Sequence, residues 1–286
     1  MKIAVIGANG QLGSDICENF SLNGDHVFRL THNDIEIVEK DSVYRCLQEL
    51  KPEIVVNTAA FHNVERCETE PEKAFCVNAQ GTENVAMVTN DLNATLFHIS
   101  TDYVFDGKKK TPYIEGDTPH PINIYGKSKL AGEQAIQSIS RKYVIMRVCG
   151  IYGRNPCRGK EGLNFIEKML KLSRERDEVR VVDDEELTPT FTQEIGRQIV
   201  AMRDIDDYGI YHTTAEGSCS WFEFAQELFR LKKITTTLHK ADCGEFSTVV
   251  VRPKYSVLEN KRLKDKKINI FKHWIEGLQE YIETLF

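Results

Sequence analysis

The stretch Lys2–Gly13, KIAVIGANGQLG, decides the fold predicted for the first half of this chain. Ile3 to Ile6 is a short apolar run typical of a buried strand, and Leu12 to Leu22 carries apolar residues at helical spacing. The residues between them include three glycines at a spacing of three, namely Gly7, Gly10 and Gly13. A strand, a glycine loop and a helix in this order favour a backbone turn that holds a pyrophosphate at the helix N-terminus. The alternative is a flexible turn without a ligand.

The same alternation continues outward from this loop. Further strand-like runs are His26–Leu30, Ile54–Val56, Leu96–Ile99 and Val144–Val148, and segments with helical spacing are Val43–Leu50, Ala74–Val88 and Ile124–Ile139. Strands separated by helices of this length pair in parallel through right-handed crossovers. The pattern predicts an α/β fold with a doubly wound, Rossmann-like parallel sheet. Residues 1–150 form the expected dinucleotide-binding domain, and 151–286 mainly a smaller substrate-binding lobe, with some elements returning to the sheet.

Composition and charge exclude several classes of function. The net charge of -6 disfavours a nucleic-acid partner, which needs a basic face. No apolar run approaches the ~20 residues that span a bilayer, so no membrane partner is expected. The eight cysteines show neither a C-x-x-C pair nor a zinc pattern, so we expect no metal. Reduced thiols in the cytoplasm are the simplest interpretation.

The segment around Tyr125 carries the candidate catalytic pair. Tyr125 and Lys129 are four residues apart at helical spacing and therefore share one face. An ammonium next to a phenol stabilises the phenolate and would lower its pKa from ~10 toward the neutral range. Upstream, Thr101 is the expected partner of the substrate oxygen, with Ser100 as the alternative, because adjacent strand residues point to opposite faces. Asp102 either accepts a substrate hydroxyl or caps a turn.

The end of the second strand bears on the choice of cofactor. An acidic residue there would bind the adenosine ribose and favour NADH. Here Arg29 and His32 stand near the strand end, and no acid occurs before Asp34. This leans toward NADPH, because Arg29 could accommodate a 2′-phosphate, although the same arginine could be a surface strand residue.

Several motifs in one order resemble a known family over nearly the whole chain. They are GANGQLG, NTAAFHNVERCETEP, STDYVFDG, PINIYGKSKLAGE, TPTFT, GSCSWFEFA and RPKYSVL. Together they resemble the dTDP-4-dehydrorhamnose reductases, which are extended short-chain dehydrogenases. The resemblance implies that NADPH or NADH reduces the C4 ketone of a nucleotide-linked sugar, giving dTDP-L-rhamnose.

The resemblance also implies roles for individual residues. By position, Gly10, Gln11 and Leu12 would contact the pyrophosphate, Thr31, Glu36 and Ile37 would lie near the adenosine, and Ala60 and Phe61 would follow the cofactor. His62 either continues this row or is a loop residue without a ligand. From their places at the glycine loop and the strand ends, further expected cofactor contacts are Gly7, Asn9, Gly13, Arg29 and Ala59. The substrate would contact Thr101, Asp102, Phe105, Asn164 and Arg252. Tyr125 would donate the proton, and Lys129 would bind the nicotinamide ribose.

Two departures from the family pattern leave alternatives open. Where the family usually has R-T-S-W, this chain has Arg147–Gly150 without the tryptophan, and D-Q-x-G-x-P-T is replaced by Asp184–Thr190. The chain could therefore reduce another nucleotide-linked 4-ketosugar. A third hypothesis is a non-catalytic subunit resembling the regulatory subunit of methionine adenosyltransferase. No ligand set for the magnesium of some family members matches, and the oligomeric state, a homodimer included, stays open.

Overall fold

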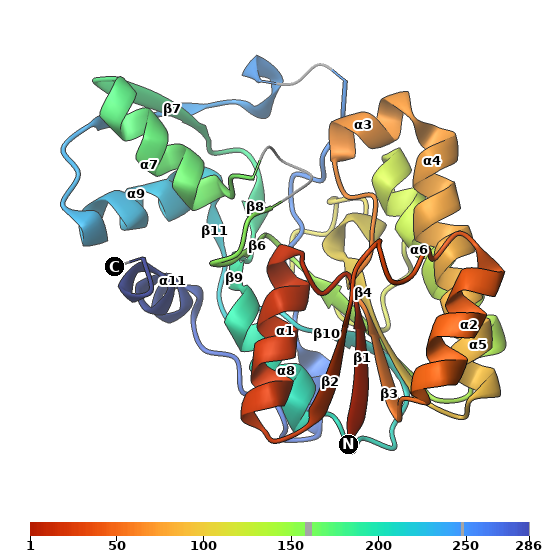
Figure 1. Cartoon of the computed structure of the whole chain (residues 1–286). Helices are drawn as coiled ribbons and strands as arrows, with labels where there is room; N and C mark the ends of the chain where they lie inside the picture. The colour runs from red at the N-terminus through yellow and green to blue at the C-terminus, as the bar shows by residue number, and fades with distance from the viewer. Residues whose placement is uncertain (158–161, 247–248, 286) are drawn as a thin grey trace.

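Six parallel strands form the central sheet of the chain, which a computed structural model describes over residues 1–157, 162–246 and 249–285. The strands are β1 (Lys2–Ile6), β2 (His26–Leu30), β3 (Ile54–Asn57), β4 (Thr95–Thr101), β5 (Tyr143–Val148) and β10 (Gly209–His212). Their order is β10-β5-β4-β3-β1-β2, and every neighbouring pair is parallel (Figure 1). This confirms the predicted doubly wound sheet, because the chain winds outward from β1 in both directions.

Helices cover both faces of the sheet. One face packs against α1 (Gln11–Leu22) and α8 (Thr192–Ala201), and the other against α2 (Lys40–Leu50), α5 (Thr82–Asp91) and α6 (Ile124–Ile139). Within β1, Ile3 and Val5 join the first layer whereas Ala4 and Ile6 join the second. Successive strand residues point to opposite faces, so a strand covered on both sides is apolar throughout.

The predicted helix over residues 74–88 is wrong as a single α-helix. The helix α3 (Val64–Thr69) precedes this range, which spans the end of α4 (Pro71–Phe75), the π-helical segment η1 (Cys76–Gly81) and most of α5. Asn78 of η1 is buried, accepts from Phe61 N at 2.8 Å and donates to Ser128 Oγ at 3.0 Å. The wider π turn lets this side chain tie the loop after β3 to α6, which hydrophobic spacing does not reveal.

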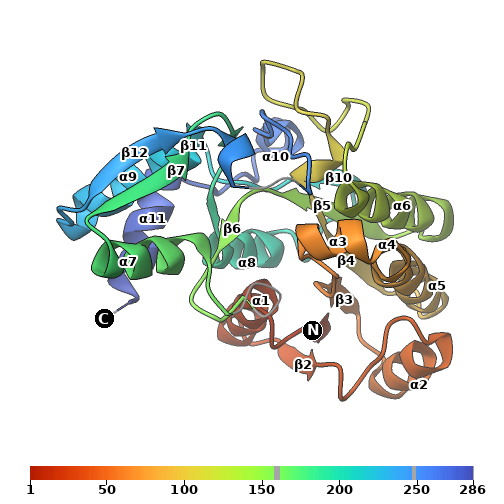
Figure 2. The ribbon, with the colours of Figure 1, turned by 90° about the horizontal axis from the view of Figure 1, so that it is seen from above.

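The second lobe has its own apolar core, set to one side of the sheet (Figure 2). Its elements are β6 (Ile151–Tyr152), α7 (Phe165–Glu175), β7 (Glu178–Val182), β8 (Glu186–Leu187), β9 (Thr190–Phe191), β11 (Cys219–Ser220), α9 (Trp221–Lys232), β12 (Thr237–Ala241) and α11 (Trp274–Glu283), with the short 3-10 turn η4 (Cys243–Glu245). The 3-10 turn η2 (Asp102–Val104) follows β4, and α10 (Lys261–Asp265) packs on the core of the sheet. Two capping boxes, Asn164 with Glu167 and Ser220 with Glu223, begin α7 and α9. Aromatic rings such as Phe224 and Trp274 meet between α9 and α11.

Three elements from the second half return to the first: α8, β10 and α10, whose Leu263 is buried in the core of the sheet. Helix α8 packs beside α1, and β10 extends the sheet next to β5. Ile195, Ile199 and Tyr211 are buried in the same cluster as the strands of the first half. The predicted division at residue 150 stays a prediction, since the sheet is completed only by chain from beyond it.

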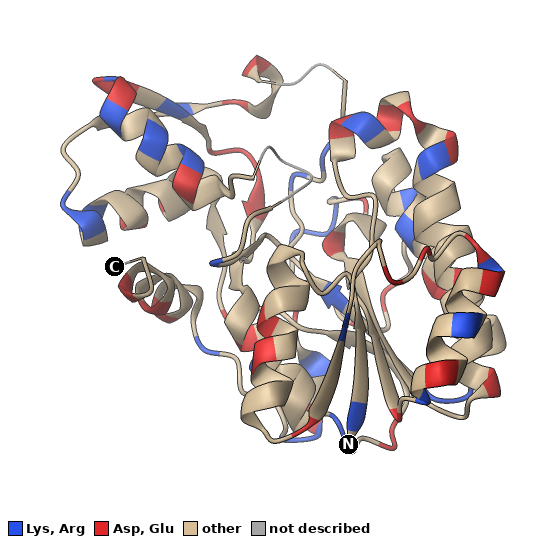
Figure 3. Cartoon of the chain, in the orientation of Figure 1, with Lys and Arg blue, Asp and Glu red and all other residues tan. Residues whose placement is uncertain are grey.

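Charged residues of both signs are intermixed on the helices that surround the sheet (Figure 3). Within the described ranges, no helix combines the length and the apolar character needed to cross a bilayer.

Candidate active site

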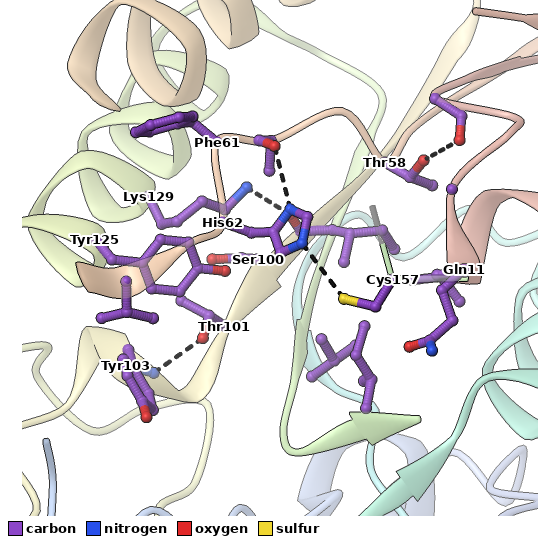
Figure 4. Close-up of a pocket in the computed structure, with 18 of the residues that line it drawn as sticks. Gln11, Thr58, Phe61, His62, Ser100, Thr101, Tyr103, Tyr125, Lys129 and Cys157 are labelled. Atoms are coloured by element: carbon purple, nitrogen blue, oxygen red, sulfur yellow. Dashed lines mark hydrogen bonds between the residues drawn. The ribbon is translucent and has the colours of Figure 1, made fainter. Parts of the chain in front are cut away.

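A cavity of about 590 Å³ lies at the carboxyl ends of β1, β3 and β4. Its walls come from both halves of the chain: the glycine loop, the segments after β3 and β4, and α6 on one side, and β8 and the start of α9 on the other. Figure 4 shows Tyr125, Lys129 and Thr101 grouped on one side, with Gln11 and Thr58 further along. In open parallel sheets, ligands bind at this edge, where the winding reverses.

The glycine loop has a geometry that side chains would obstruct. Gly7 has φ +81°, and a Cβ there would lie 2.6 Å from Thr58 Oγ1. A Cβ on Gly13 would lie 2.2 Å from the carbonyl oxygen of Gly7. Glycine at both positions lets α1 pack closely on the turn and on the residue that follows β3.

The N-terminus of α1 fits an anionic group. Gly10 is its N-cap, and no side chain caps the first turn. Asn9, Gln11 and Leu12 line the cavity next to it. Uncapped N–H groups at a helix N-terminus bind phosphate, so the residues present fit the pyrophosphate of a dinucleotide.

The adenosine end of the cavity contains some of the predicted residues and omits others. Thr31 and Ile37 line it, whereas the described wall does not include Arg29 or Glu36. Arg29 is two residues from Val27 in β2 and so points to the face of the sheet that α1 covers, where its charge acts on Cys17. Glu36 accepts from Val38 N at 3.3 Å instead. For these two residues the expected cofactor contact is not supported by the geometry.

The segment after β3 forms the middle of the wall. Ala59, Ala60 and Phe61, the predicted contacts along the cofactor, all line the cavity. Two buried side chains accept hydrogen bonds from the backbone of this segment. Ala59 N donates to Asn57 Oδ1 at 3.1 Å, and Phe61 N donates to Asn78 Oδ1. The backbone here is therefore held in place by buried side-chain amides.

Tyr125 and Thr101 meet inside the cavity. The hydroxyl of Thr101 is hydrogen-bonded to the phenol of Tyr125 and donates to Asp102 Oδ1 at 2.9 Å. Burial raises the pKa of Tyr125, and the negative charge of Asp102 raises it further. The expected lowering of the phenol pKa is therefore not seen, and the phenol holds its proton at neutral pH.

Ser100, the alternative to Thr101, is committed elsewhere. Its hydroxyl donates to the carboxylate of Glu133, which pairs with Arg147 at 2.6 Å. Glu133 and Arg147 are both 1% exposed or less. The Thr101 hydroxyl, unlike that of Ser100, is hydrogen-bonded to the phenol of Tyr125, so the geometry favours Thr101 as the hydroxyl at the site.

Lys129 contacts the floor of the cavity and not the phenol. Its Nζ lies 2.6 Å from Ile99 O and 3.0 Å from His98 Nε2, and the residue is 1% exposed. Burial lowers the pKa of Lys129 to about 8, with the charge of Glu133 opposing that shift. Helical spacing correctly predicted the face of α6 from which Lys129 projects. The position of its Nζ is set by Ile99 O and His98 Nε2 of β4.

Asp102 is held by groups that the sequence did not indicate. Besides Thr101, its carboxylate accepts from Cys149 Sγ at 3.1 Å and from Ser256. Burial raises the pKa of Asp102, and these three hydrogen bonds oppose the rise. Cys149 and Ser256 lie in distant parts of the sequence and meet only in the folded chain.

Of three further residues predicted to contact the substrate, one lines the cavity and two do not. Asn164 lines the cavity, but its amide is used to cap α7 and to donate to Gly153 O and Tyr281 Oη. Phe105 is fully buried and stacks on Tyr113, with ring centroids 4.2 Å apart. Arg252 pairs with Glu65 outside the described wall. The expected substrate contacts of Phe105 and Arg252 are therefore not supported, because their side chains are bound in other places.

The second lobe adds residues that sequence patterns did not select. Trp221 and Glu185 line the cavity, and burial raises the pKa of Glu185. His62 lies opposite Cys157, with 3.6 Å between His62 Nε2 and Cys157 Sγ (Figure 4). Trp221 lies in the motif GSCSWFEFA that carries the family resemblance, and the capping box at Ser220 marks the start of α9 without indicating a site.

A side chain at position 150, where the family pattern has tryptophan, would be strained and would crowd Leu187. Gly150 has a φ of +53°, and a Cβ there would lie 2.7 Å from Leu187 Cδ1. Leu187 stands where the D-Q-x-G-x-P-T pattern has glycine. Both residues line the cavity, so the apolar group at this point comes from β8 instead of from the segment after β5.

Comparisons with known proteins agree with this geometry. The whole chain, residues 1–286, matches the family described as RmlD substrate binding domain. The spore coat polysaccharide biosynthesis protein SpsK of Bacillus subtilis (strain 168) is 37% identical over 99% of this chain and 97% of its own. A dTDP-4-keto-6-deoxy-D-glucose reductase of Streptomyces niveus is 34% identical over 98% and 96%. The crystal structure of dTDP-4-dehydrorhamnose reductase from Bacillus anthracis in complex with NADP has a TM-score of 0.94 and 34% identity, covering 99% of each chain.

The Rossmann-like sheet, the glycine loop and the Thr101, Tyr125 and Lys129 group define a nicotinamide-dependent oxidoreductase of the short-chain dehydrogenase type. Within that class, the chain belongs to the RmlD family, the dTDP-4-dehydrorhamnose reductases.

Proposed function

We propose that this chain is an NADPH-dependent reductase that converts the C4 ketone of dTDP-4-dehydro-L-rhamnose to the alcohol of dTDP-L-rhamnose. The proposal is carried by one observation: Thr101, Tyr125, Lys129 and the glycine loop share the wall of a single cavity. The Bacillus anthracis relative, a dTDP-4-dehydrorhamnose reductase with bound NADP, supports it.

The residues at the two ends of the cavity fit NADPH. The N-terminus of α1 would hold the pyrophosphate, and the bound cofactor would supply the hydride. At the adenosine end the described wall consists of Thr31, His32, Ile35 and Ile37 and contains no carboxylate. The carboxylates of Asp34 and Glu36 lie next to this wall, bound to Thr31 and His32. The choice of NADPH therefore rests on the relative with bound NADP.

Tyr125 supplies the proton in this reaction. Because burial and Asp102 raise the pKa of the phenol, the proton stays on Oη until a stronger base forms beside it. The alkoxide that forms when C4 receives a hydride is such a base. The proton of Tyr125 Oη passes to that oxygen, and the ketone becomes an alcohol. Thr101 holds the phenol in place by its hydrogen bond.

The test measures NADPH oxidation with purified protein and dTDP-4-dehydro-L-rhamnose. Tyr125→Phe should lower the rate by at least about 100-fold, the usual contribution of a positioned general acid, while NADPH still binds. Tyr113→Phe is the matched control, because that ring stacks on Phe105 outside the described wall, and it should keep the rate. Wild-type turnover in Tyr125→Phe would contradict the proposed role.

A second candidate substrate is dTDP-4-keto-6-deoxy-D-glucose. The Streptomyces niveus relative is named as a reductase of this sugar. In addition, this chain has glycine at position 150, where the family pattern has tryptophan, and leucine at position 187, where the pattern has glycine, and this changes the shape of the cavity wall. Both sugars present a ketone at C4, so the same residues would act. The NADPH-oxidation assay is run with each of the two sugars. The sugar that gives the larger kcat/KM is the preferred substrate.

The nucleotide sugar is the partner that this proposal requires. The cytoplasmic location and the homodimer remain predictions. A purely regulatory role is disfavoured, because the complete set of Thr101, Tyr125 and Lys129 is present in one cavity.

A further inference from the structure

Glu185 brings a buried carboxyl group from the second lobe into the cavity. It directly precedes β8, lines the cavity wall and is 8% exposed. On the opposite side of the same cavity, Thr101 and Tyr125 form the catalytic group. The reaction described above does not use Glu185, although its carboxyl group faces the space in which a substrate would bind.

An aromatic wall holds this carboxyl group in place. The indole of Trp221 donates a hydrogen bond to Glu185. The antiparallel pairing of Glu186 with Ser220 brings the two residues together, because Glu185 precedes the first and Trp221 follows the second. The ring of Trp221 packs against Phe165, with 4.5 Å between the ring centroids, and both rings line the cavity. The second lobe therefore presents an apolar surface with one acidic group fixed beside it.

Glu185 lacks the counter-charge that its neighbour has. Asp184 pairs with Lys254 at 3.0 Å. The charge of Arg252 acts on Glu185, but the ion pair of that arginine is with Glu65. Among the residues that the structure describes, Glu185 has no ion pair of its own. A buried carboxylate without a counter-charge costs free energy, so its presence in a cavity wall points to a ligand that supplies hydrogen-bond donors.

The charges around Glu185 indicate what kind of ligand group this is. Burial raises the pKa of Glu185, Arg252 opposes the rise, and the negative charges of Asp184 and Asp102 add to it. Asp102 lines the same cavity, so a phosphate placed between Asp102 and Glu185 would be repelled by both. A hydroxyl group is neutral and can donate to a carboxylate. The geometry therefore fits the sugar part of a nucleotide sugar, with its diphosphate directed elsewhere.

We propose that Glu185 is a specificity-determining residue whose carboxylate accepts a hydrogen bond from a hydroxyl of the substrate sugar. The inference rests on the proposed function, and it adds a sugar contact from the second lobe to those from the first.

Trp221 fixes the chemical character of this contact. The indole N–H can only donate, so it takes one carboxylate oxygen and leaves the other as an acceptor for the ligand. The D-Q-x-G-x-P-T pattern has an amide at this position. An amide would give its oxygen to Trp221 and present N–H donors to the ligand instead. Glutamate therefore favours a hydroxyl that donates, through a charge-assisted hydrogen bond.

The test separates the sugar from the nucleotide. Isothermal titration calorimetry measures the binding of dTDP and of dTDP-L-rhamnose to the full-length protein saturated with NADPH, which does not react with an alcohol. Glu185→Ala should weaken the binding of dTDP-L-rhamnose by about tenfold or more, the usual effect of losing a hydrogen bond to a charged group. The affinities for dTDP and for NADPH should stay as in the wild type.

Glu185→Gln distinguishes the carboxylate from its effect on Trp221. This variant keeps the shape of the side chain and an oxygen for the indole, but it loses the charged acceptor. Its affinity for dTDP-L-rhamnose should lie between those of Glu185→Ala and the wild type, because charge-assisted hydrogen bonds are roughly twice as strong as neutral ones. Wild-type affinity in Glu185→Gln would show that the residue only orients Trp221, and the proposal would be rejected.

Asp184→Asn is the matched control. It makes the same carboxylate-to-amide change one residue earlier, outside the described wall, and should leave all three affinities unchanged. An equal loss of dTDP and dTDP-L-rhamnose binding in Glu185→Ala would place the contact on the nucleotide and overturn the inference. Loss of NADPH binding in Glu185→Gln would also overturn it, because the residue would then support the fold and not the sugar.

The outcomes distinguish this inference from the proposed function. A reductase whose kcat/KM for the ketosugar is unchanged in Glu185→Ala would retain the function and lose the inference. A protein that binds dTDP-L-rhamnose through Glu185 but turns over no nucleotide-linked ketosugar would lose the proposed function alone.

Discussion

At the scale of single residues, the proton on Tyr125 is kept by its surroundings. The phenol is enclosed by Thr101, by the ring of Tyr103 at 5.9 Å between centroids, and by the nearby Asp102. A low dielectric and a neighbouring carboxylate both penalise a phenolate. A site built in this way holds a proton ready to donate, which suits the reduction of a ketone better than the oxidation of an alcohol.

The buried ion pair between Glu133 and Arg147 anchors the same region. Arg147 donates to Glu133 from Nε at 3.0 Å and from one terminal nitrogen at 2.6 Å, and Ser100 donates to the same carboxylate. Glu133→Gln should lower the free energy of unfolding by about 3–5 kcal/mol, because it leaves the buried guanidinium without its counter-charge. Urea denaturation measures this loss.

The control for this prediction is a surface pair of the same chemistry. Arg230 is 64% exposed and pairs with Glu227, so Glu227→Gln should have a much smaller effect. Equal losses in the two variants would mean that burial does not set the strength of the Glu133 pair.

At the scale of elements, the turn between β1 and α1 depends on glycine for two separate reasons. Gly7→Ala places a Cβ against Thr58 Oγ1 and adopts a left-handed backbone that costs an L-residue about 1–2 kcal/mol. We expect NADPH binding to be lost, because Thr58 or the loop must move. Isothermal titration calorimetry measures the binding.

Gly24→Ala separates the two reasons. Gly24 has φ +83° but nothing within 4 Å of the position of its Cβ. This variant should show only the backbone strain, as a loss of stability, and should bind NADPH like the wild type. If it too failed to bind NADPH, the steric explanation for Gly7 would be rejected.

Local signals predicted some elements far better than others. The helix predicted from spacing over Ile124–Ile139 matches α6 to its bounds, and the structure adds the N-cap, in which Asn123 accepts from Gly126 N. The region of α4, η1 and α5 was predicted as one helix. The π turn there exists to place the buried Asn78 against Phe61, which is a tertiary contact.

At the scale of the whole molecule, Glu194 lies between the two halves. It belongs to α8, which packs on the sheet, and a Cβ on Gly277 of α11 would lie 2.8 Å from its Oε2. Within the described chain, this oxygen and Tyr152 Oη have no hydrogen-bond partner. Burial raises the pKa of Glu194 to about 7.

This raised pKa predicts a pH dependence of stability. The native state binds more protons than the unfolded chain between the ordinary pKa of 4.5 and about 7, so stability falls as pH rises through that window. At ~1.4 kcal/mol per pKa unit, the cost above the window is about 3 kcal/mol. Glu194→Gln should therefore be more stable than the wild type at ~pH 8 and nearly equal at ~pH 5. Urea denaturation at both pH values tests this, and an equal difference at both would count against it.

The candidate site could be predicted in part. Gly7–Gly13, Ala59–Phe61, Thr101, Asp102 and the Tyr125/Lys129 pair line one cavity, because each follows a strand or begins a helix at the same edge of the sheet. Arg29, Phe105 and Arg252 do not line the described wall, because side-chain direction and competing partners decided their places.

The amino-acid sequence alone determined the parallel α/β architecture, the glycine loop and the pairing of Tyr125 with Lys129 on one helix face, because strand alternation, helical spacing and glycine conformation are local properties. Only the tertiary structure decided that Lys129 binds His98 and Ile99, that Leu187 faces Gly150, and that α8 and β10 complete the sheet. These outcomes depend on which distant side chains compete for the same space and the same hydrogen bonds, and no spacing along the chain records that competition.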